Sequence, residues 1–118
     1  LLTVTGVQTC ALPISEGKLK EVQLNTDGEG NLEILQSAVG GWVQAVDLSN
    51  NLTLWCNEEG KLQGLSTNRI ATTMWEEVFG RTDVIVGDVI FTGGTGDEGE
   101  TLGLDDETAN KIRKRVTA

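Results

Sequence analysis

The segment from Asn57 to Arg69 holds the polar side chains with the clearest chemical potential in this sequence. A glycine-containing loop leads into an expected helix near Asn68, and the N-terminus of a helix favours an anion through its unpaired N–H groups and its dipole. Lys61 and Arg69 would pair with phosphate, while Asn57 and Asn68 would bind polar edges of a base. The candidate ligand-binding residues are Trp55, Asn57, Glu59, Lys61, Asn68, Arg69 and Thr72.

A structural interpretation of the same residues stays open. The stretch 66–68 could serve only as helix caps, and the stretch 57–60 could form a tight turn with Asx hydrogen bonds. Neither role requires a ligand.

The tryptophans are the second group with binding potential, because indole rings stack on nucleobases. Trp75 has helical spacing with apolar neighbours and is expected in the core. Trp55 alternates with Leu54 and Cys56 along a strand, so it faces away from them and is the better candidate for a ligand or subunit contact. Cys56 is expected to be a buried, inert thiol.

Three further motifs have less potential for chemistry. Residues 94–99 match G-x-G-x-x-G, but acidic residues occupy the place of a pyrophosphate and no helix opens there, so a flexible loop is expected. The acidic residues between Asp97 and Glu107 lack calcium-loop spacing, and we expect no metal. The neighbouring glutamates at 58–59 and 76–77 point in different directions, so neither pair forms a catalytic dyad.

Composition excludes several classes of function. Histidine is absent, which removes the usual general base and any Ser–His or Cys–His nucleophile, so we expect a binding protein that is not an enzyme and needs no cofactor. Eighteen Asp and Glu against nine Lys and Arg give a formal net charge of -9, which disfavours nucleic-acid binding. No apolar run is long enough for a membrane span, so we expect no membrane partner.

Residues 1–15 are expected to have a different origin from the rest of the chain. Val4 to Ile14 read VTGVQTCALPI, which matches in frame the translated 3′ end of a widely used short-read sequencing adapter. We predict that residues 1–15 are a non-native, adapter-derived segment and that residues 16–118 form a single small α+β domain. Residues 11–15 can still fold as a strand. Cys56 then has no native disulfide partner, which is typical of a reducing compartment.

Apolar spacing predicts the order strand, helix, hairpin, helix, strand, helix. The expected ranges are 18–25, 32–39, 42–48 with 52–57, 68–79, 83–91 and a short helix after residue 105. We expect Asn31 and Asp105 to cap helices, Gly40 and Gly80 to end them, and Gly87 to bulge the last strand. The predicted fold is α+β, a small antiparallel or mixed β-sheet with two to three helices packed mainly on one face.

Three stretches carry a family resemblance: residues 35–41 (LQSAVGG), residues 57–65 (NEEGKLQGL), and Asn68 with Ala71 and Thr72. Residues 83, 85, 87–88, 99 and 104 fit the same pattern. Over about residues 17–110 the chain resembles a domain of unknown function, family number thirty-eight forty-six, found mostly in bacteriophages and other mobile elements. The sequence departs from the family at its N-terminal strand, where adapter residues stand. The resemblance implies a phage origin and a small α+β domain, and no known reaction.

The leading hypothesis is a phage-encoded anti-defence protein that sequesters a nucleotide-derived host immune signal. It would act as a sponge in the cytoplasm of an infected bacterial host, as a homo-oligomer with a small nucleotide-derived ligand as its partner. The alternative is an acidic protein-interaction module that inhibits a host protein by mimicking a phosphate backbone. A weak hydrolase using Glu58 or Glu59 is a third hypothesis.

Overall fold

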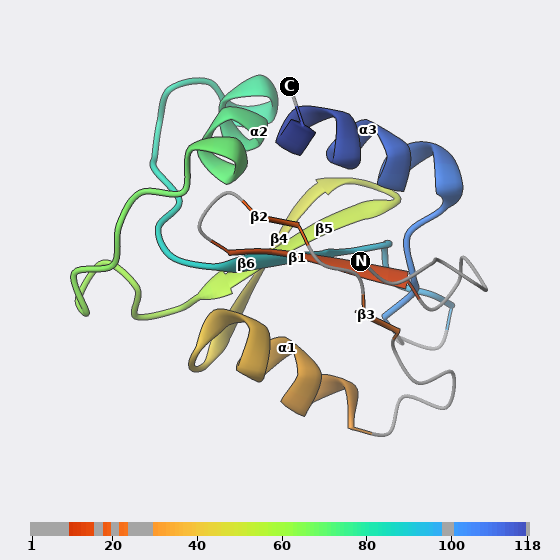
Figure 1. Cartoon of the computed structure of the whole chain (residues 1–118), viewed down its shortest axis with the longest axis horizontal. Coiled ribbons are helices and arrows are strands. Elements are labelled where there is room, and N and C mark those ends of the chain that lie inside the picture. The colour runs from red at the N-terminus through yellow and green to blue at the C-terminus, as the bar shows by residue number, and fades with distance from the viewer. Residues whose placement is uncertain (1–9, 16–17, 20–21, 24–29, 98–100, 118) are drawn as a thin grey trace.

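The computed structural model describes residues 10–15, 18–19, 22–23, 30–97 and 101–117 of the 118-residue chain. The described residues form six strands and three helices (Figure 1). In chain order they are β1 (Cys10–Ser15), β2 (Lys18–Leu19), β3 (Val22–Gln23), α1 (Asn31–Val39), β4 (Val43–Ser49), β5 (Leu52–Asn57), α2 (Arg69–Phe79), β6 (Val89–Thr92) and α3 (Asp106–Thr117).

The strands form one sheet in the order β2-β1-β6-β5-β4, with β3 pairing the start of β1. Every strand pair among the described residues is antiparallel. The short strand β6 lies at the centre and all four of its residues are buried. The strand expected over residues 11–15 is present as β1, which pairs with β6.

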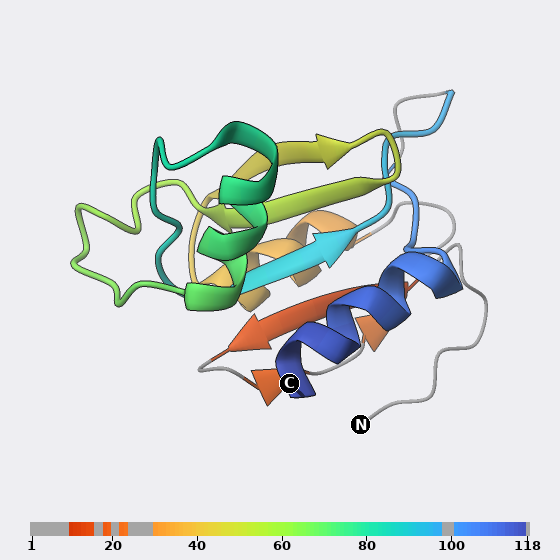
Figure 2. The ribbon, with the colours of Figure 1, turned by 90° about the horizontal axis from the view of Figure 1, so that it is seen from above.

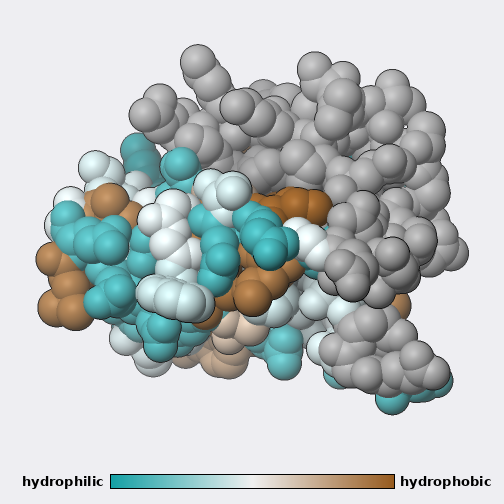
Figure 3. All heavy atoms as spheres, turned by 90° about the horizontal axis from the view of Figure 1, so that it is seen from below, coloured by the Kyte–Doolittle hydropathy of each residue, from teal (hydrophilic) through white to brown (hydrophobic). Residues whose placement is uncertain are grey.

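Helices cover both faces of the sheet, with α2 and α3 on one face and α1 on the other (Figure 1). Alternation along β6 supplies both cores, because Val89 and Phe91 pack with residues of α2 and α3 while Ile90 packs with Leu35 and Val39 of α1. The predicted α+β class is confirmed, and two of the three described helices share a face. Seen from the α1 side, hydrophilic and apolar residues are interspersed over the described surface (Figure 3).

The helix ends follow local chemistry with one correction. Asn31 does not cap α1: Gly30 holds the cap position with a φ of 74°, a conformation that favours glycine, and Asn31 is the first helical residue. The Asn68 side chain caps α2 by accepting the Ala71 N–H at 3.1 Å. Asp105 caps α3, as predicted, by accepting the Thr108 N–H at 2.7 Å.

The strand predicted over 83–91 is too long, because only Val89–Thr92 joins the sheet as β6. Upstream of it, Val86 bridges Thr67, and the Gly87 N–H donates to the Ser66 carbonyl at 2.8 Å. Gly87 has a φ of 78°, so the chain turns there instead of bulging within a strand. The segment 85–87 is therefore paired with the residues that lead into α2.

Two other expectations are adjusted. The strand predicted over 18–25 is divided into β2 and β3, and residues 20–21 and 24–25 lie outside the described part. The stretch after β6, expected as a flexible loop, contains backbone pairing: the Gly93 N–H donates to the Leu102 carbonyl and the Leu102 N–H to the Gly94 carbonyl, each at 2.9 Å. Residues 98–100 of this stretch lie outside the description.

Candidate functional site

A groove of about 800 Å³ lies at the N-terminal end of α2. Its walls come from the C-terminal ends of α1, β5 and α3, from Gln63, from residues 65–70 around the start of α2, and from the turn at residues 87–88. Small-molecule sites typically measure about 300–1,000 Å³, so the groove has the size of one.

The charges that line the groove are two arginines and one carboxylate: Arg69, Arg115 and Asp88. Arg115 forms an ion pair with Glu77 of α2. Arg69 is exposed and makes no ion pair with any residue in the described ranges. As the first residue of α2 it also stands where the helix dipole is positive, so this part of the groove favours an anion.

Asn57 lies in the wall of the groove, where the protein itself uses its side chain. Its Nδ2 donates to the Val39 carbonyl and to Gln63 Oε1, each at 3.3 Å, and its Oδ1 accepts the Glu59 N–H at 2.8 Å. These bonds tie the loop after β5 to the end of α1. Asn57 is therefore a residue that shapes the wall.

Asn68 has a similar role on the other wall. Besides capping α2, it donates from Nδ2 to the Gly87 carbonyl at 2.9 Å, and its backbone N–H donates to the Ile85 carbonyl at 2.8 Å. The start of α2 is thus fixed to the segment before β6.

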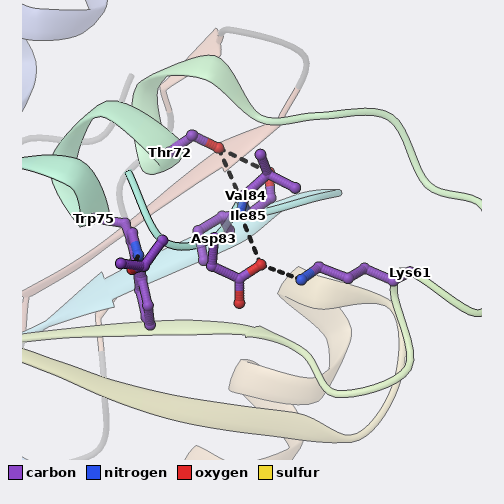
Figure 4. Close-up of polar contacts among 7 residues, drawn as sticks. Lys61, Thr72, Trp75, Asp83, Val84 and Ile85 are labelled. Carbon is purple, nitrogen blue, oxygen red and sulfur yellow. Dashed lines mark hydrogen bonds and ion pairs between the residues drawn. The ribbon is translucent and has the colours of Figure 1, made fainter. Parts of the chain in front are cut away.

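Lys61 does not line the groove. Its ammonium pairs with the Asp83 carboxylate, and both side chains are substantially exposed (Figure 4). The hydrogen bond from Lys61, followed by the one from the Val84 N–H, lowers the pKa of Asp83. Glu59 is exposed and also lies outside the lining.

Trp55 and Thr72 are built into the packing between elements. Trp55 packs against the α1 core cluster, and its Nε1 donates to Thr92 Oγ1 at 2.8 Å. Thr72 Oγ1 donates to the Ile85 carbonyl at 3.2 Å and accepts the Ile85 N–H at 2.9 Å (Figure 4). Neither residue lines the groove. The structure thus brings Asn57, Asn68 and Arg69 together, and places the other candidates elsewhere.

Sequence reasoning missed Arg115, Asp88 and Gly87 as lining residues. In the sequence, Arg115 is one of several basic residues at the end of the last helix, where they complement its dipole. Only the packing of α3 beside α2 brings it to the groove.

The other two tryptophans and the buried cysteine lie outside the groove lining. Trp75 is partly buried against the main core, with its ring centroid 4.4 Å from that of Phe79. Trp42 is 65% exposed. Cys56 is buried, and burial raises the pKa of its thiol, which leaves little reactive thiolate at neutral pH.

Within the described ranges, no group of three or more His, Cys, Asp or Glu side chains is arranged to hold a metal ion. None of the helices described is long and apolar enough to cross a membrane.

No curated protein and no solved structure matches this chain. One family does match, over residues 8–117, and this range includes the three stretches that carried the resemblance. The match begins inside the segment 1–15, whose adapter origin stays a prediction. Because the match covers nearly the whole sequence, the chain belongs to the family described as Domain of unknown function (DUF3846).

Proposed function

We propose that this chain is a phage-encoded binding protein that sequesters a nucleotide-derived anionic signal in the groove at the start of α2. The observation that carries the proposal is the place of Arg69, an exposed guanidinium on the first turn of α2 that lines a groove of about 800 Å³. Its biological role would be anti-defence, in the cytoplasm of an infected bacterium and as a homo-oligomer.

A phosphate group fits the chemistry of this position. A guanidinium binds phosphate oxygens with two parallel hydrogen bonds. The N–H groups of Arg69 and Ile70 at the start of α2 add further donors, whereas Asn68 already accepts the Ala71 N–H.

The net charge of -9 repels a long polyanion. A small ligand feels mainly the charges that line the groove, because charges beyond about 8 Å are largely screened at physiological salt. These are Arg69, Asp88 and Arg115, and Arg115 is paired with Glu77, so Arg69 is the guanidinium available to a phosphate.

The walls of the groove favour binding because their own hydrogen bonds hold them in place. Asn57 and Asn68 each join two segments of the lining. A site that is ordered before the ligand arrives loses less conformational entropy on binding.

The proposed activity is retention of an intact ligand. Ser66 and Thr67 supply hydroxyls to the lining, and the chain contains no histidine that could activate them. The carboxylate of Asp88 is the single acidic group among the described lining residues.

The test is a release assay. The purified protein is mixed with a panel of cyclic dinucleotides, cyclic oligonucleotides and NAD-derived cyclic signals, freed of unbound ligand and heated, and the released compounds are identified by mass spectrometry. We expect one intact compound from the wild type and none from Arg69→Ala. Arg81→Ala is the matched control, because it removes the same charge from an exposed residue outside the groove.

Other outcomes contradict the proposal in distinct ways. A chemically altered compound would indicate an enzyme. No retained compound would remove the sponge hypothesis for the panel tested and favour the acidic protein-interaction module, which predicts salt-sensitive capture of a host protein. Equal loss of retention in both arginine variants would show that overall charge, and not the groove, holds the ligand.

A further inference from the structure

The strand β4 forms an open edge of the sheet. It is last in the strand order, next to β5, and no other strand among the described residues lies beyond it in Figure 2. It has seven residues, whereas β2 at the opposite end of the order has two. A long open edge exposes a row of backbone donors and acceptors that can pair with another strand.

The pairing of β4 with β5 shows which of its backbone groups point outward. The Glu58 N–H donates to the Trp42 carbonyl at 2.8 Å, in register with the pair Val43↔Asn57. In an antiparallel ladder, hydrogen-bonded pairs alternate with pairs that are not hydrogen-bonded. The even-numbered residues therefore bond to β5, and the outward N–H and C=O groups belong to Val43, Ala45 and Asp47.

The outward segment lacks the usual protection of an edge strand. Natural edges carry lysine, proline or a bulge that prevents pairing. Residues 43–47 (VQAVD) contain no lysine and no proline, and Asp47 is their one charged residue. The irregularity in β4 comes after them, between Asp47 and Ser49. Five consecutive residues are thus available as a template.

We propose that β4 is a dimerisation edge, and that a second copy of this chain pairs with it antiparallel about a two-fold axis at Ala45. The outward residues are symmetric about Ala45, so Ala45 lies opposite the partner's Ala45 and Val43 lies opposite the partner's Asp47. Every outward N–H then meets an outward carbonyl. Opposing residues also lie on the same side of their sheets, which makes the joined sheet continuous.

The charge on the strand itself does not oppose a second copy as the occupant, despite the net charge of -9. In this register the two Asp47 residues lie four positions apart along the strand direction, about 13 Å at 3.3 Å per residue. That separation exceeds the screening length of about 8 Å at physiological salt, so their repulsion is weak. Each Asp47 instead lies opposite an uncharged valine.

Trp42 supplies apolar surface to the same interface. It directly precedes β4, its carbonyl continues the β5 ladder, and its side chain is 65% exposed. The register places it at the end of the paired segment, beside the partner's irregularity between Asp47 and Ser49, where Leu48 is buried in its own core. Pairing would therefore cover only part of the exposed indole at each end of the joined strands.

The first experiment is sedimentation velocity of the full chain over a concentration series, without any ligand. We expect a species of twice the 12.6 kDa chain mass. Ala45→Pro removes an outward N–H that β5 does not use, so the fold is retained by circular dichroism. The loss of the two symmetric hydrogen bonds at the axis raises the dimer dissociation constant about tenfold to a hundredfold.

A second variant keeps the proposal testable if proline disturbs β4. Ala45→Asp places two carboxylates directly opposite each other at the axis and should yield monomers. Ser37→Asp, on an exposed position of α1, adds the same charge and should leave the dimer intact. A monomer at every concentration overturns the proposal. So does a dimer that withstands both changes at Ala45, or one that Ser37→Asp dissociates equally.

Discussion

The hydroxyl of Thr72 forms hydrogen bonds with both backbone polar groups of Ile85, a pair of bonds called the clamp below. It accepts the Ile85 N–H at 2.9 Å and donates to the Ile85 carbonyl at 3.2 Å. Ile85 is buried and lies thirteen residues further along the chain. The Asn68 N–H donates to the same carbonyl. Through these bonds α2 is joined to the segment before β6, and the groove lies where the two meet.

Replacing Thr72 with valine should destabilise the fold. Valine keeps the shape and removes the hydroxyl, which leaves the buried Ile85 N–H without a partner and lowers the free energy of unfolding by about 1–3 kcal/mol. Urea denaturation measures the change. Thr72→Ser should retain most of the stability, and Thr73→Val, whose hydroxyl bonds only within α2, should cost about 0.5 kcal/mol or less. Equal losses at 72 and 73 would contradict the role of the clamp.

Trp55→Phe distinguishes a packing role from a ligand-stacking role. Phenylalanine keeps an aromatic ring beneath α1 but loses the Nε1 bond to Thr92, so stability should fall by about 0.5–1.5 kcal/mol. Retention of ligand in the release assay should not change, because Trp55 does not line the groove. Lost retention with unchanged stability would restore Trp55 as a ligand contact.

Gly94→Ala should be more damaging than Gly64→Ala. A Cβ at Gly94 would lie 2.0 Å from the Asn50 carbonyl oxygen, a backbone atom in the turn between β4 and β5, so one of the two segments must move. A Cβ at Gly64 meets open space, and only its φ of 71° penalises alanine, by about 1–2 kcal/mol. Thermal melts of the two variants compare the costs. Equal melting temperatures would show that the backbone at Gly94 and Asn50 can move apart at little cost, which would contradict the prediction.

The cap formed by Asp105 makes the stability of the fold depend on pH in the acidic range. The hydrogen bond from the Thr108 N–H lowers the pKa of Asp105, so the folded state prefers the ionised carboxylate. Its contribution is complete above the ordinary Asp pKa of about 3.9 and is lost as the pH falls through the lowered value. Asp105→Ala should therefore cost about 1 kcal/mol at neutral pH and progressively less in acid below about pH 3.9.

Urea denaturation at neutral and acidic pH measures that difference. Asp106→Ala is the control, since it removes the same charge from the neighbouring position without removing the cap bond to Thr108. A cost for Asp105→Ala that is the same at both pH values would contradict the contribution of the ionised carboxylate.

Local patterns determined much of the fold from the sequence alone. The β4–β5 hairpin and α2, from its Asn68 cap to Gly80, follow from alternation, helical spacing and capping residues that lie within a few positions of one another. Such signals depend on neighbouring side chains and backbone geometry, so distant parts of the chain are not needed to produce them.

Tertiary structure decided which candidate residues share the groove. Lys61 and Arg69 are close in sequence, yet an ion pair with Asp83 holds Lys61 outside the lining. Trp55 faces away from its strand neighbours as predicted, and α1 packs over it. Arg115 reaches the groove only because α3 lies beside α2. These placements depend on contacts between distant segments, whose free energies are set by the packing of the whole chain and leave no local sequence pattern.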